Sequence, residues 1–310
     1  MTPQRPASTM VRRDGTRAGY VVLTGLPNAG KSTLLNALVG DYLSIVTPKA
    51  QTTWQRVVGI RTEGPTQVIF LDTPGIVSSD ELFHRSMVAE AEGARTEADV
   101  VIGVVDGAAG MSRKRLGAFE DFLGRVGCPA ALAINKCDLP GFDAAAARHL
   151  ADRLGLPVHV VSARRGAGLD ELLAFVRHSL PEGPFLYPED DIAAAPTRFF
   201  VQELVRETIF EHFHQEIPYG VAVKVEEFRE SEEPVYIAAV LYVERKSQKG
   251  IVVGRGGRAI RRLGSDARRK IEHFLGRRVY LDLWVKVWEG WRRKNEGLMT
   301  FGYVVPDDEA

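Results

Sequence analysis

The sequence has little cysteine and no long apolar run. Its 310 residues include two cysteines, Cys128 and Cys137, and no Cys or His residues stand at the spacing of a zinc site. This pattern argues against a disulfide scaffold and against a structural zinc module. The absence of any run of about 18 apolar residues argues against a membrane-spanning helix. The polar N-terminus lacks the apolar core of a signal peptide, so we expect a soluble, cytoplasmic protein.

A net charge of either sign is also missing, because 40 basic residues balance 40 acidic residues. The distribution along the chain is uneven, however. Residues 189–240 contain 4 basic and 12 acidic residues, whereas residues 241–297 contain 16 basic and 6 acidic residues. The basic region is therefore a candidate surface for a polyanion.

The apolar pattern divides the chain into two parts. Between residues 18 and 181, short apolar runs alternate with helical stretches, which predicts an α/β domain with a doubly wound, mostly parallel sheet. Residues 1–17 are expected to form a disordered arm. The expected strands are 20–24, 57–61, 66–71, 100–105, 130–134 and 158–161, and the expected helices are 31–39, 82–95, 113–126, 144–154 and 169–180.

A proline-rich, acidic segment at residues 182–196 is expected to link this domain to a second one at residues 197–305. The pattern of the second part predicts a helix, two strands, a second helix and a third strand, which is a small α+β domain. These elements are expected at 199–213, 220–228, 235–244, 257–274 and 279–287.

A glycine-rich segment follows the first expected strand and leads into a helix. Gly25-Leu26-Pro27-Asn28-Ala29-Gly30-Lys31-Ser32 fits the phosphate-binding loop pattern, with four residues between two glycines and then Lys and Ser. Glycine lets the backbone N–H groups wrap around phosphate oxygens, and the positive end of the helix faces the anion. We expect Lys31 to reach the β- and γ-phosphates and the Ser32 hydroxyl to bind Mg²⁺.

Asp72-Thr73-Pro74-Gly75 stands at the end of another expected strand. A carboxylate at this position can hold Mg²⁺ through a water, and the N–H of Gly75 can bond to the γ-phosphate. The alternative for Asp72 taken alone is a strand-end residue that caps a turn.

Two motifs at later strand ends predict selection of guanine. In Asn135-Lys136-Cys137-Asp138, the carboxylate of Asp138 can accept both hydrogen bonds that the edge of guanine donates and that adenine does not offer. In Ser162-Ala163-Arg164, a backbone N–H can meet the guanine O6. All four motifs fall at the edge of the sheet where ligands bind in open α/β folds. The expected nucleotide-binding residues are Gly25, Pro27, Asn28, Ala29, Gly30, Lys31, Ser32, Thr33, Asp72, Thr73, Pro74, Gly75, Asn135, Lys136, Asp138, Ser162, Ala163 and Arg164.

These motifs together resemble those of the translation-factor-related class of small GTPases. The resemblance implies a first switch loop at residues 41–55, in which Thr52 or Thr53 binds Mg²⁺ in the GTP state, beside Ser32 and Asp72. Relatives place this threonine directly before a basic residue, which favours Thr53, but Trp54 departs from that pattern and leaves the choice open. The catalytic residues that the resemblance implies are Lys31, Thr53, Asp72 and Gly75.

Two other positions concern hydrolysis. Ras-like GTPases carry a glutamine where this chain has Ile76, which cannot orient a water. Asn28 resembles the asparagine with which GTPases of this class bind K⁺, and a monovalent cation could supply the charge of an arginine finger. A simple turn residue is the alternative for Asn28.

The basic region contains Gly254-Arg255-Gly256-Gly257 directly before an amphipathic helix. This tetrapeptide matches the GXXG loop of KH domains, which clamps the backbone of single-stranded nucleic acid. The alternative is a glycine-rich turn before a solvated basic helix. The expected RNA-binding residues are Gly254, Arg255, Gly256, Gly257, Arg258, Arg261 and Arg262. Trp284, Trp288 and Trp291 are predicted either to stack on bases or to pack in the core, and the core is favoured.

A GTPase domain with Pro27-Asn28 in its loop and Gln51-Thr52-Thr53 in its switch, followed by this KH domain, resembles the Era GTPase family over residues 17–305. The resemblance implies a monomer whose GTPase domain hydrolyses GTP to GDP with Mg²⁺ and whose second domain is a type II KH domain. It also implies binding of 16S rRNA near its 3′ end and a role in assembly of the small (30S) ribosomal subunit. The alternative is a membrane-associated signalling GTPase whose basic domain binds lipid or protein. Peripheral association with the inner face of the cell membrane is left open.

Overall fold

The computed structural model of the chain describes residues 15–75, 81–109 and 113–306. The described chain divides into two compact units, one that runs to Ala194 and one that begins at Ala195, with Glu81–Phe83 grouped with the second. Most of the expected N-terminal arm, residues 1–14, lies outside the described residues. No described helix is both long and apolar enough to cross a membrane.

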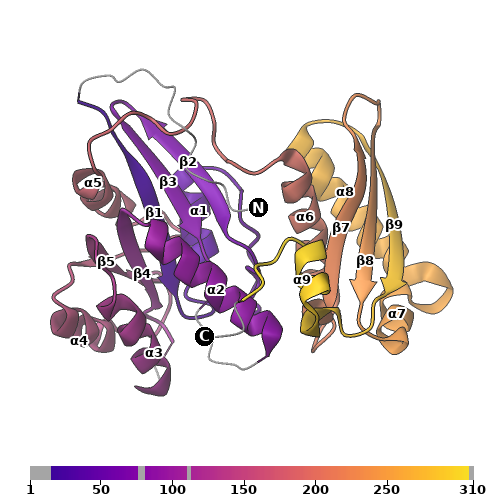
Figure 1. The fold of residues 1–310 in the computed structure, drawn as a ribbon, viewed down its shortest axis with the longest axis horizontal. Helices are drawn as coiled ribbons and strands as arrows, with labels where there is room; N and C mark the ends of the chain where they lie inside the picture. The colour runs from indigo at the N-terminus through magenta and orange to yellow at the C-terminus, as the bar shows by residue number, and fades with distance from the viewer. Residues whose placement is uncertain (1–14, 76–80, 110–112, 307–310) are drawn as a thin grey trace. The chain divides into compact units, whose positions relative to one another are not determined.

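The first unit is built on a six-stranded sheet in the order β2-β3-β1-β4-β5-β6 (Figure 1). β2 pairs antiparallel with β3, and every other neighbouring pair is parallel. The central strands are buried almost throughout, as their continuous apolar runs predict for strands covered on both faces. The strands are β1 (Arg17–Gly25), β2 (Val57–Glu63), β3 (Thr66–Asp72), β4 (Val100–Asp106), β5 (Ala130–Asn135) and β6 (Val158–Val160).

Helices cover both faces of this sheet, so the predicted doubly wound α/β fold is confirmed. The helices are α1 (Lys31–Val39), α2 (Leu82–Glu97), α3 (Arg113–Gly124), α4 (Ala145–Leu154) and α5 (Leu169–Ser179). One face packs Tyr20 and Val22 of β1 against residues of α2, α3 and α4. The opposite face is so close to its helices that a Cβ on Gly59 would lie 2.7 Å from Val39 at the end of α1. Because the helices cover the two faces, the loops that follow β1, β3, β4 and β5 lie together at the carboxyl edge of the sheet.

The segment expected as a linker is tied to the sheet over much of its length. The side-chain oxygen of Gln67 on β3 accepts the N–H groups of Leu186 and Tyr187, at 2.7 and 2.9 Å. The N–H of Ile60 on β2 donates to the carbonyl of Ile192 over 2.8 Å. The chain therefore leaves the first unit only at about residue 194.

The second unit is a three-stranded sheet with helices. Its elements are α6 (Thr197–His212), β7 (Val221–Arg229), β8 (Val235–Val243), α7 (Lys246–Val253), α8 (Arg258–Leu275), β9 (Val279–Val287) and α9 (Asn295–Thr300). The order is β7-β8-β9, with β7 and β8 antiparallel and β8 and β9 parallel. α7 is not among the helices expected from the sequence. It is short, it contains Gly250, and only Gln248 and Val252 of it are buried, so it shows no apolar stripe.

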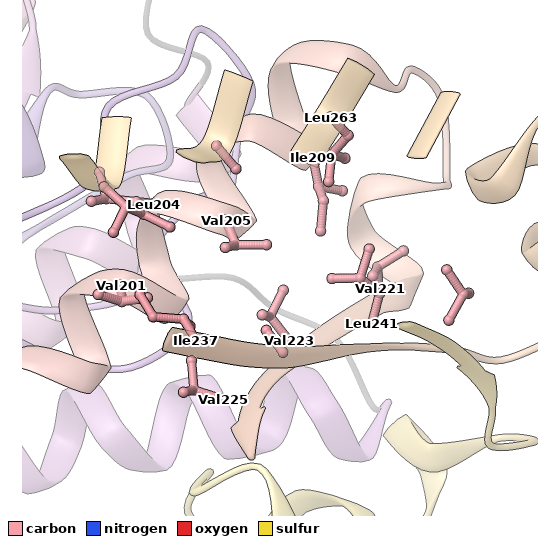
Figure 2. Close-up of a cluster of buried hydrophobic side chains, with 14 of the residues drawn as sticks. Val201, Leu204, Val205, Ile209, Val221, Val223, Val225, Ile237, Leu241 and Leu263 are labelled. Carbon is pink, nitrogen blue, oxygen red and sulfur yellow. The ribbon is translucent and has the colours of Figure 1, made fainter. Parts of the chain in front are cut away.

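The core of the second unit lies between the helices and the sheet. Figure 2 shows Val201, Val205 and Ile209 of α6 converging with Val223 of β7 and Ile237 of β8. α8 contributes buried side chains to the same cluster, Leu263, Ala267 and Ile271. This core fixes the start of α8, and with it the glycine loop that precedes the helix.

Candidate nucleotide and RNA sites

The glycines of the phosphate-binding loop permit its close approach to Asn135-Lys136-Cys137-Asp138, called the base motif below. Gly30 has φ +93, and a Cβ on it would lie 2.4 Å from Asn135 Nδ2. That nitrogen donates to the carbonyl of Ala29 over 3.0 Å. Only glycine combines this backbone conformation with so little space. The loop and the Asn135 motif are thus in direct contact.

Lys31 is buried at the base of the phosphate-binding loop, with 6% of the residue exposed. Its Nζ donates to the carbonyls of Gly25 and Leu26, each at 3.3 Å. Burial lowers the pKa of the ammonium, and the nearby Asp72 carboxylate acts in the opposite direction. Two long bonds to neutral carbonyls leave this cation well suited to an anionic phosphate.

Asp72 is fully buried at the end of β3 and collects hydroxyl groups on one of its oxygens. Oδ2 accepts from Ser32 at 2.6 Å, from Ser44 at 2.8 Å and from Thr53 at 3.3 Å. Oδ1 is buried and has no hydrogen-bond partner. Burial raises the pKa of Asp72, while the Lys31 charge and the three hydroxyls lower it. A carboxylate with an open oxygen among hydroxyl oxygens fits Mg²⁺, which prefers such hard ligands.

The structure separates the two threonines of the first switch loop. Thr53 Oγ1 lies 2.9 Å from Ser32 Oγ and within reach of Asp72. Thr52 Oγ1 instead donates to the carbonyl of Lys49 over 2.9 Å and lies 2.7 Å from Thr47 Oγ1. Only Thr53 therefore joins the group around the Asp72 carboxylate.

A cavity of about 290 Å³ opens between the phosphate-binding loop and the first switch loop. Its lining includes Lys31 and Ser32, residues 45–49 of the switch, and Gly75. Asn28 stands at the same cavity with its amide Nδ2 3.4 Å from the carbonyl of Pro48. Ile76 lies outside the described residues.

The base motif is organised around its amide and its carboxylate. Asn135 Oδ1 accepts the N–H of Ala163 over 3.0 Å, which joins this motif to the Ser162-Ala163-Arg164 motif. Asp138 is exposed, and its Oδ1 accepts the hydroxyl of Ser162 over 2.6 Å. That hydrogen bond is the main reason that the pKa of Asp138 is lowered. An ionised carboxylate is therefore presented at the surface beside the loop.

Asp106 is a site residue that the motifs do not include. It ends β4, and its Oδ2 accepts Lys136 Nζ over 2.6 Å. The same ammonium donates to the carbonyl of Asn28 over 2.7 Å. Asp106 therefore holds the lysine of the base motif against the phosphate-binding loop. The available signal was an aspartate that ends a buried strand at the edge already identified by the motifs.

The glycine loop of the second unit has three left-handed glycines. Gly254, Gly256 and Gly257 have φ of 69, 60 and 74. A Cβ on Gly254 would lie 2.6 Å from the Cβ of Ala259, whereas a Cβ on Gly256 would meet open space. The exposed guanidinium of Arg261 donates to the carbonyl of Gly257 over 3.2 Å. Arg255, Arg258 and Arg262 are also exposed around this loop.

The tryptophans differ in their surroundings. Trp291 is fully buried, and its indole N–H donates to the carbonyl of Gly220 over 3.2 Å. Trp288 packs beside Phe301, whereas Trp284 on β9 is 58% exposed. Trp291 therefore belongs to the core, and Trp284 is the most accessible of the three.

Comparisons with known proteins agree over nearly the whole chain. A family model described as 50S ribosome-binding GTPase matches residues 20–136, and a KH domain model matches residues 216–292. The GTPase Era of Carboxydothermus hydrogenoformans is 39% identical over 297 residues, covering 93% of this chain and 98% of the relative. The GTPase Era of Geotalea uraniireducens is 40% identical over 291 residues, covering 93% and 98%.

Two solved structures are similar to this chain over most of its length. Era of Aquifex aeolicus bound to GDP and AlF4⁻ has a TM-score of 0.85 and is 37% identical, covering 93% of this chain and 99% of that one. Era in complex with MgGDPNP and a fragment of 16S ribosomal RNA has a TM-score of 0.86 at the same identity and coverage.

Proposed function

This chain belongs to the Era family of GTPases, and we propose that it couples GTP hydrolysis to binding of 16S rRNA in the assembly of the 30S ribosomal subunit. GTP hydrolysis and the KH domain follow from the family itself. The observation that carries the rest is the presence in one chain of a nucleotide cavity and an exposed, basic GXXG loop. A relative of the same fold holds MgGDPNP and a 16S rRNA fragment together. We place the activity in the cytoplasm, in a monomer.

The phosphate end of the site is assigned to five residues. Lys31 binds the β- and γ-phosphates, and the N–H of Gly75 bonds to the γ-phosphate. Ser32 and Thr53 would ligate Mg²⁺ directly, with Asp72 acting through a water. When bound, Mg²⁺ neutralises charge that develops on the phosphates. Pre-organised cations and N–H donors in a site of low water content are the main means by which such enzymes accelerate phosphoryl transfer.

Guanine selection is assigned to the second group of motifs. The carboxylate of Asp138 accepts the two donors of the guanine edge, and a backbone N–H of the Ser162-Ala163-Arg164 motif meets O6. Asn135 and Asp106 act indirectly, by holding these segments against the phosphate-binding loop.

A potassium ion beside Asn28 is the finer part of this proposal. Asn28 is an exposed residue of the phosphate-binding loop, and its Nδ2 lies 3.4 Å from the carbonyl of Pro48. The amide oxygen of Asn28 and that carbonyl oxygen could share a monovalent cation. Steady-state hydrolysis should then be faster in KCl than in NaCl at equal ionic strength, and Asn28→Ala should remove the difference. If the unmodified chain hydrolyses GTP at equal rates in both salts, the role of K⁺ is wrong. The assignment of GTP hydrolysis to this chain would not be affected.

RNA binding is assigned to the glycine loop and the first turns of α8. Glycines let phosphates approach the main chain, and Arg255, Arg258, Arg261 and Arg262 neutralise them. The experiment measures binding of a single-stranded oligonucleotide with the 3′-terminal sequence of 16S rRNA, with and without GDPNP. The double variant Arg255→Asp, Gly256→Asp should lose RNA binding and keep its affinity for GTP, because the cavity lies in the other unit.

The same double variant also tests the alternative function. A membrane-associated GTPase would bind vesicles of anionic phospholipid through this basic region and would show no preference for RNA. RNA binding that survives the double variant with unchanged affinity would contradict the assignment to the KH loop. Flotation of the chain with anionic vesicles, in the absence of RNA binding, would support the alternative.

A further inference from the structure

A third hydroxyl at the carboxylate of Asp72 is not among the expected ligands. Ser44, in the first switch loop, donates its hydroxyl to Asp72 Oδ2 over 2.8 Å. It is 1% exposed and is not part of the lining of the nucleotide cavity. A buried serine that faces a carboxylate and not the cavity acts on the carboxylate, and only through it on a nucleotide.

Ser44 is fixed to α1. Asn36 Oδ1 on that helix accepts the N–H groups of Leu43 and Ser44, at 3.0 and 2.8 Å. Asn36 Nδ2 donates to the carbonyl of Ser44 over 2.7 Å. Three hydrogen bonds thus tie the main chain of Leu43 and Ser44 to the helix that begins at Lys31. The position of its hydroxyl therefore does not depend on where the later part of the loop, with Thr53, lies.

The three hydroxyl groups that donate to Asp72 have different roles. Ser32 and Thr53 are assigned above as ligands, so the lone pairs of their oxygens are needed by the cation when it is bound. Ser44 is not assigned as a ligand, and its hydroxyl donates to Asp72. All three donate to Oδ2, and Oδ1 is the buried oxygen without a hydrogen-bond partner.

We propose that Ser44 is a positioning residue of the magnesium site, whose hydroxyl holds Asp72 Oδ2 and leaves Oδ1 open for a water carried by the cation. This inference rests on the proposed assignment of Mg²⁺ to Ser32, Thr53 and Asp72. Hydrogen bonds to a metal's ligands orient those ligands, and their removal typically weakens metal binding by about 10- to 100-fold.

The test measures Mg²⁺ affinity without hydrolysis. The full chain is loaded with a fluorescent GDP, and nucleotide release is followed at buffered concentrations of free Mg²⁺. Ser44→Ala should move the midpoint to about tenfold higher Mg²⁺ or more. Ser44→Cys should do the same, because a thiol nearly keeps the volume of the side chain but is a weak donor. The GDP affinity in excess chelator and the melting temperature of Ser44→Cys should stay unchanged.

Two further variants make the result decisive. Ser86→Ala removes a hydroxyl from another buried serine, which lies on α2, and should leave the Mg²⁺ midpoint unchanged. Asp72→Asn should weaken Mg²⁺ more than either change at Ser44. If Asp72→Asn weakens Mg²⁺ while both Ser44 variants bind it normally, the inference about Ser44 is wrong and the magnesium assignment stands. If Asp72→Asn has no effect, the assignment itself is wrong. A normal midpoint for Ser44→Cys beside a weakened Ser44→Ala would show that packing, and not the hydrogen bond, is responsible.

Discussion

Asp138 shows how a single exposed side chain decides which base can bind. Its Oδ1 accepts the hydroxyl of Ser162 over 2.6 Å. This bond lowers the pKa of Asp138, so the carboxylate is ionised at neutral pH. An ionised carboxylate accepts hydrogen bonds and donates none, which matches the two donors on the guanine edge.

Asp138→Asn should therefore reverse the base preference. The amide can donate as well as accept, so it fits xanthine better than guanine. Each hydrogen bond to a charged group contributes about 1.5–3 kcal/mol, so GTP affinity should fall by roughly 100-fold or more while XTP affinity rises. Competition between GTP and XTP for the loaded chain measures both changes. Asp152→Asn, an exposed aspartate on α4, is the matched control and should bind as the unmodified chain does. Unchanged GTP affinity in Asp138→Asn would contradict the assignment.

Asp106 acts on the site through Lys136. Asp106→Asn removes the charge that holds Lys136 Nζ but keeps an oxygen for the N–H groups of Ala108 and Ala109, which Oδ1 now accepts. GTP affinity should fall by about tenfold, as for one charge-assisted hydrogen bond. The ratio of GTP to XTP affinity should not change, because the contact with the base is made by Asp138. A changed ratio in the same competition assay would show that Asp106 meets the base directly.

At the scale of elements, the glycine loop shows how the position of each glycine determines the backbone conformation that the chain can adopt. Gly254 has φ 69 and ψ 170, a region open in practice to glycine alone, whereas Gly256 has φ 60 and ψ 28. The first glycine joins α7 to the loop against Ala259, and the second stands in open space. The two glycines therefore have unequal tolerance for a side chain.

Gly254→Ala should damage the second unit, and Gly256→Ala should be much milder. The first change adds backbone strain of about 1–3 kcal/mol to a clash with Ala259. The second costs about 1–2 kcal/mol for a left-handed residue, with no clash. Thermal unfolding and RNA binding of the two variants measure the difference. GTP affinity should stay the same in both. Equal effects of the two changes on stability would argue that the loop is not held as described.

Helix α7 shows where sequence patterns stop being informative at this scale. The pattern of α1 predicts its bounds, Lys31–Val39, because an apolar stripe follows directly on the phosphate-binding loop. α7 has no such stripe, and its start is set by the Gln248 side chain, which accepts the N–H groups of Glu244 and Arg245. Caps of this kind depend on one side-chain rotamer, so spacing alone does not reveal them.

At the scale of the whole molecule, positive charge is concentrated in the segment that carries the glycine loop. Residues 241–297 contain 16 basic and 6 acidic residues, although the chain as a whole is neutral. Several acidic residues of the second unit are engaged in ion pairs, such as Glu244 with Arg292 and Glu207 with Lys270. The four arginines around the loop are exposed, so an approaching polyanion meets positive charge there.

RNA affinity should fall steeply as salt rises, because each phosphate contact releases counterions. Four arginines at the loop and α8, Arg255, Arg258, Arg261 and Arg262, predict a slope of about −3 in a plot of log affinity against log salt, at about −0.7 per contact. Arg262→Gln should reduce the magnitude of the slope by about 0.7. Lys114→Gln, at a lysine outside the second unit, should not change it. Titration of RNA binding with KCl gives the slopes, and a slope near zero would exclude a phosphate clamp.

The sequence by itself determined the class of each half and the motifs that mark the sites. A phosphate-binding loop and a GXXG loop are each formed by consecutive residues, because their function depends on local backbone conformation. Both can therefore be recognised from the sequence. Alternation and helical spacing likewise report which side chains face a core. Only the tertiary structure placed the hydroxyl of Thr53, and not that of Thr52, beside Asp72, and only it brought Ser44 to Asp72 and Asp106 to Lys136. Those last two pairs are 28 and 30 residues apart in the chain. Their meeting depends on how β1, β3, β4 and β5 align at one edge, which no local pattern encodes.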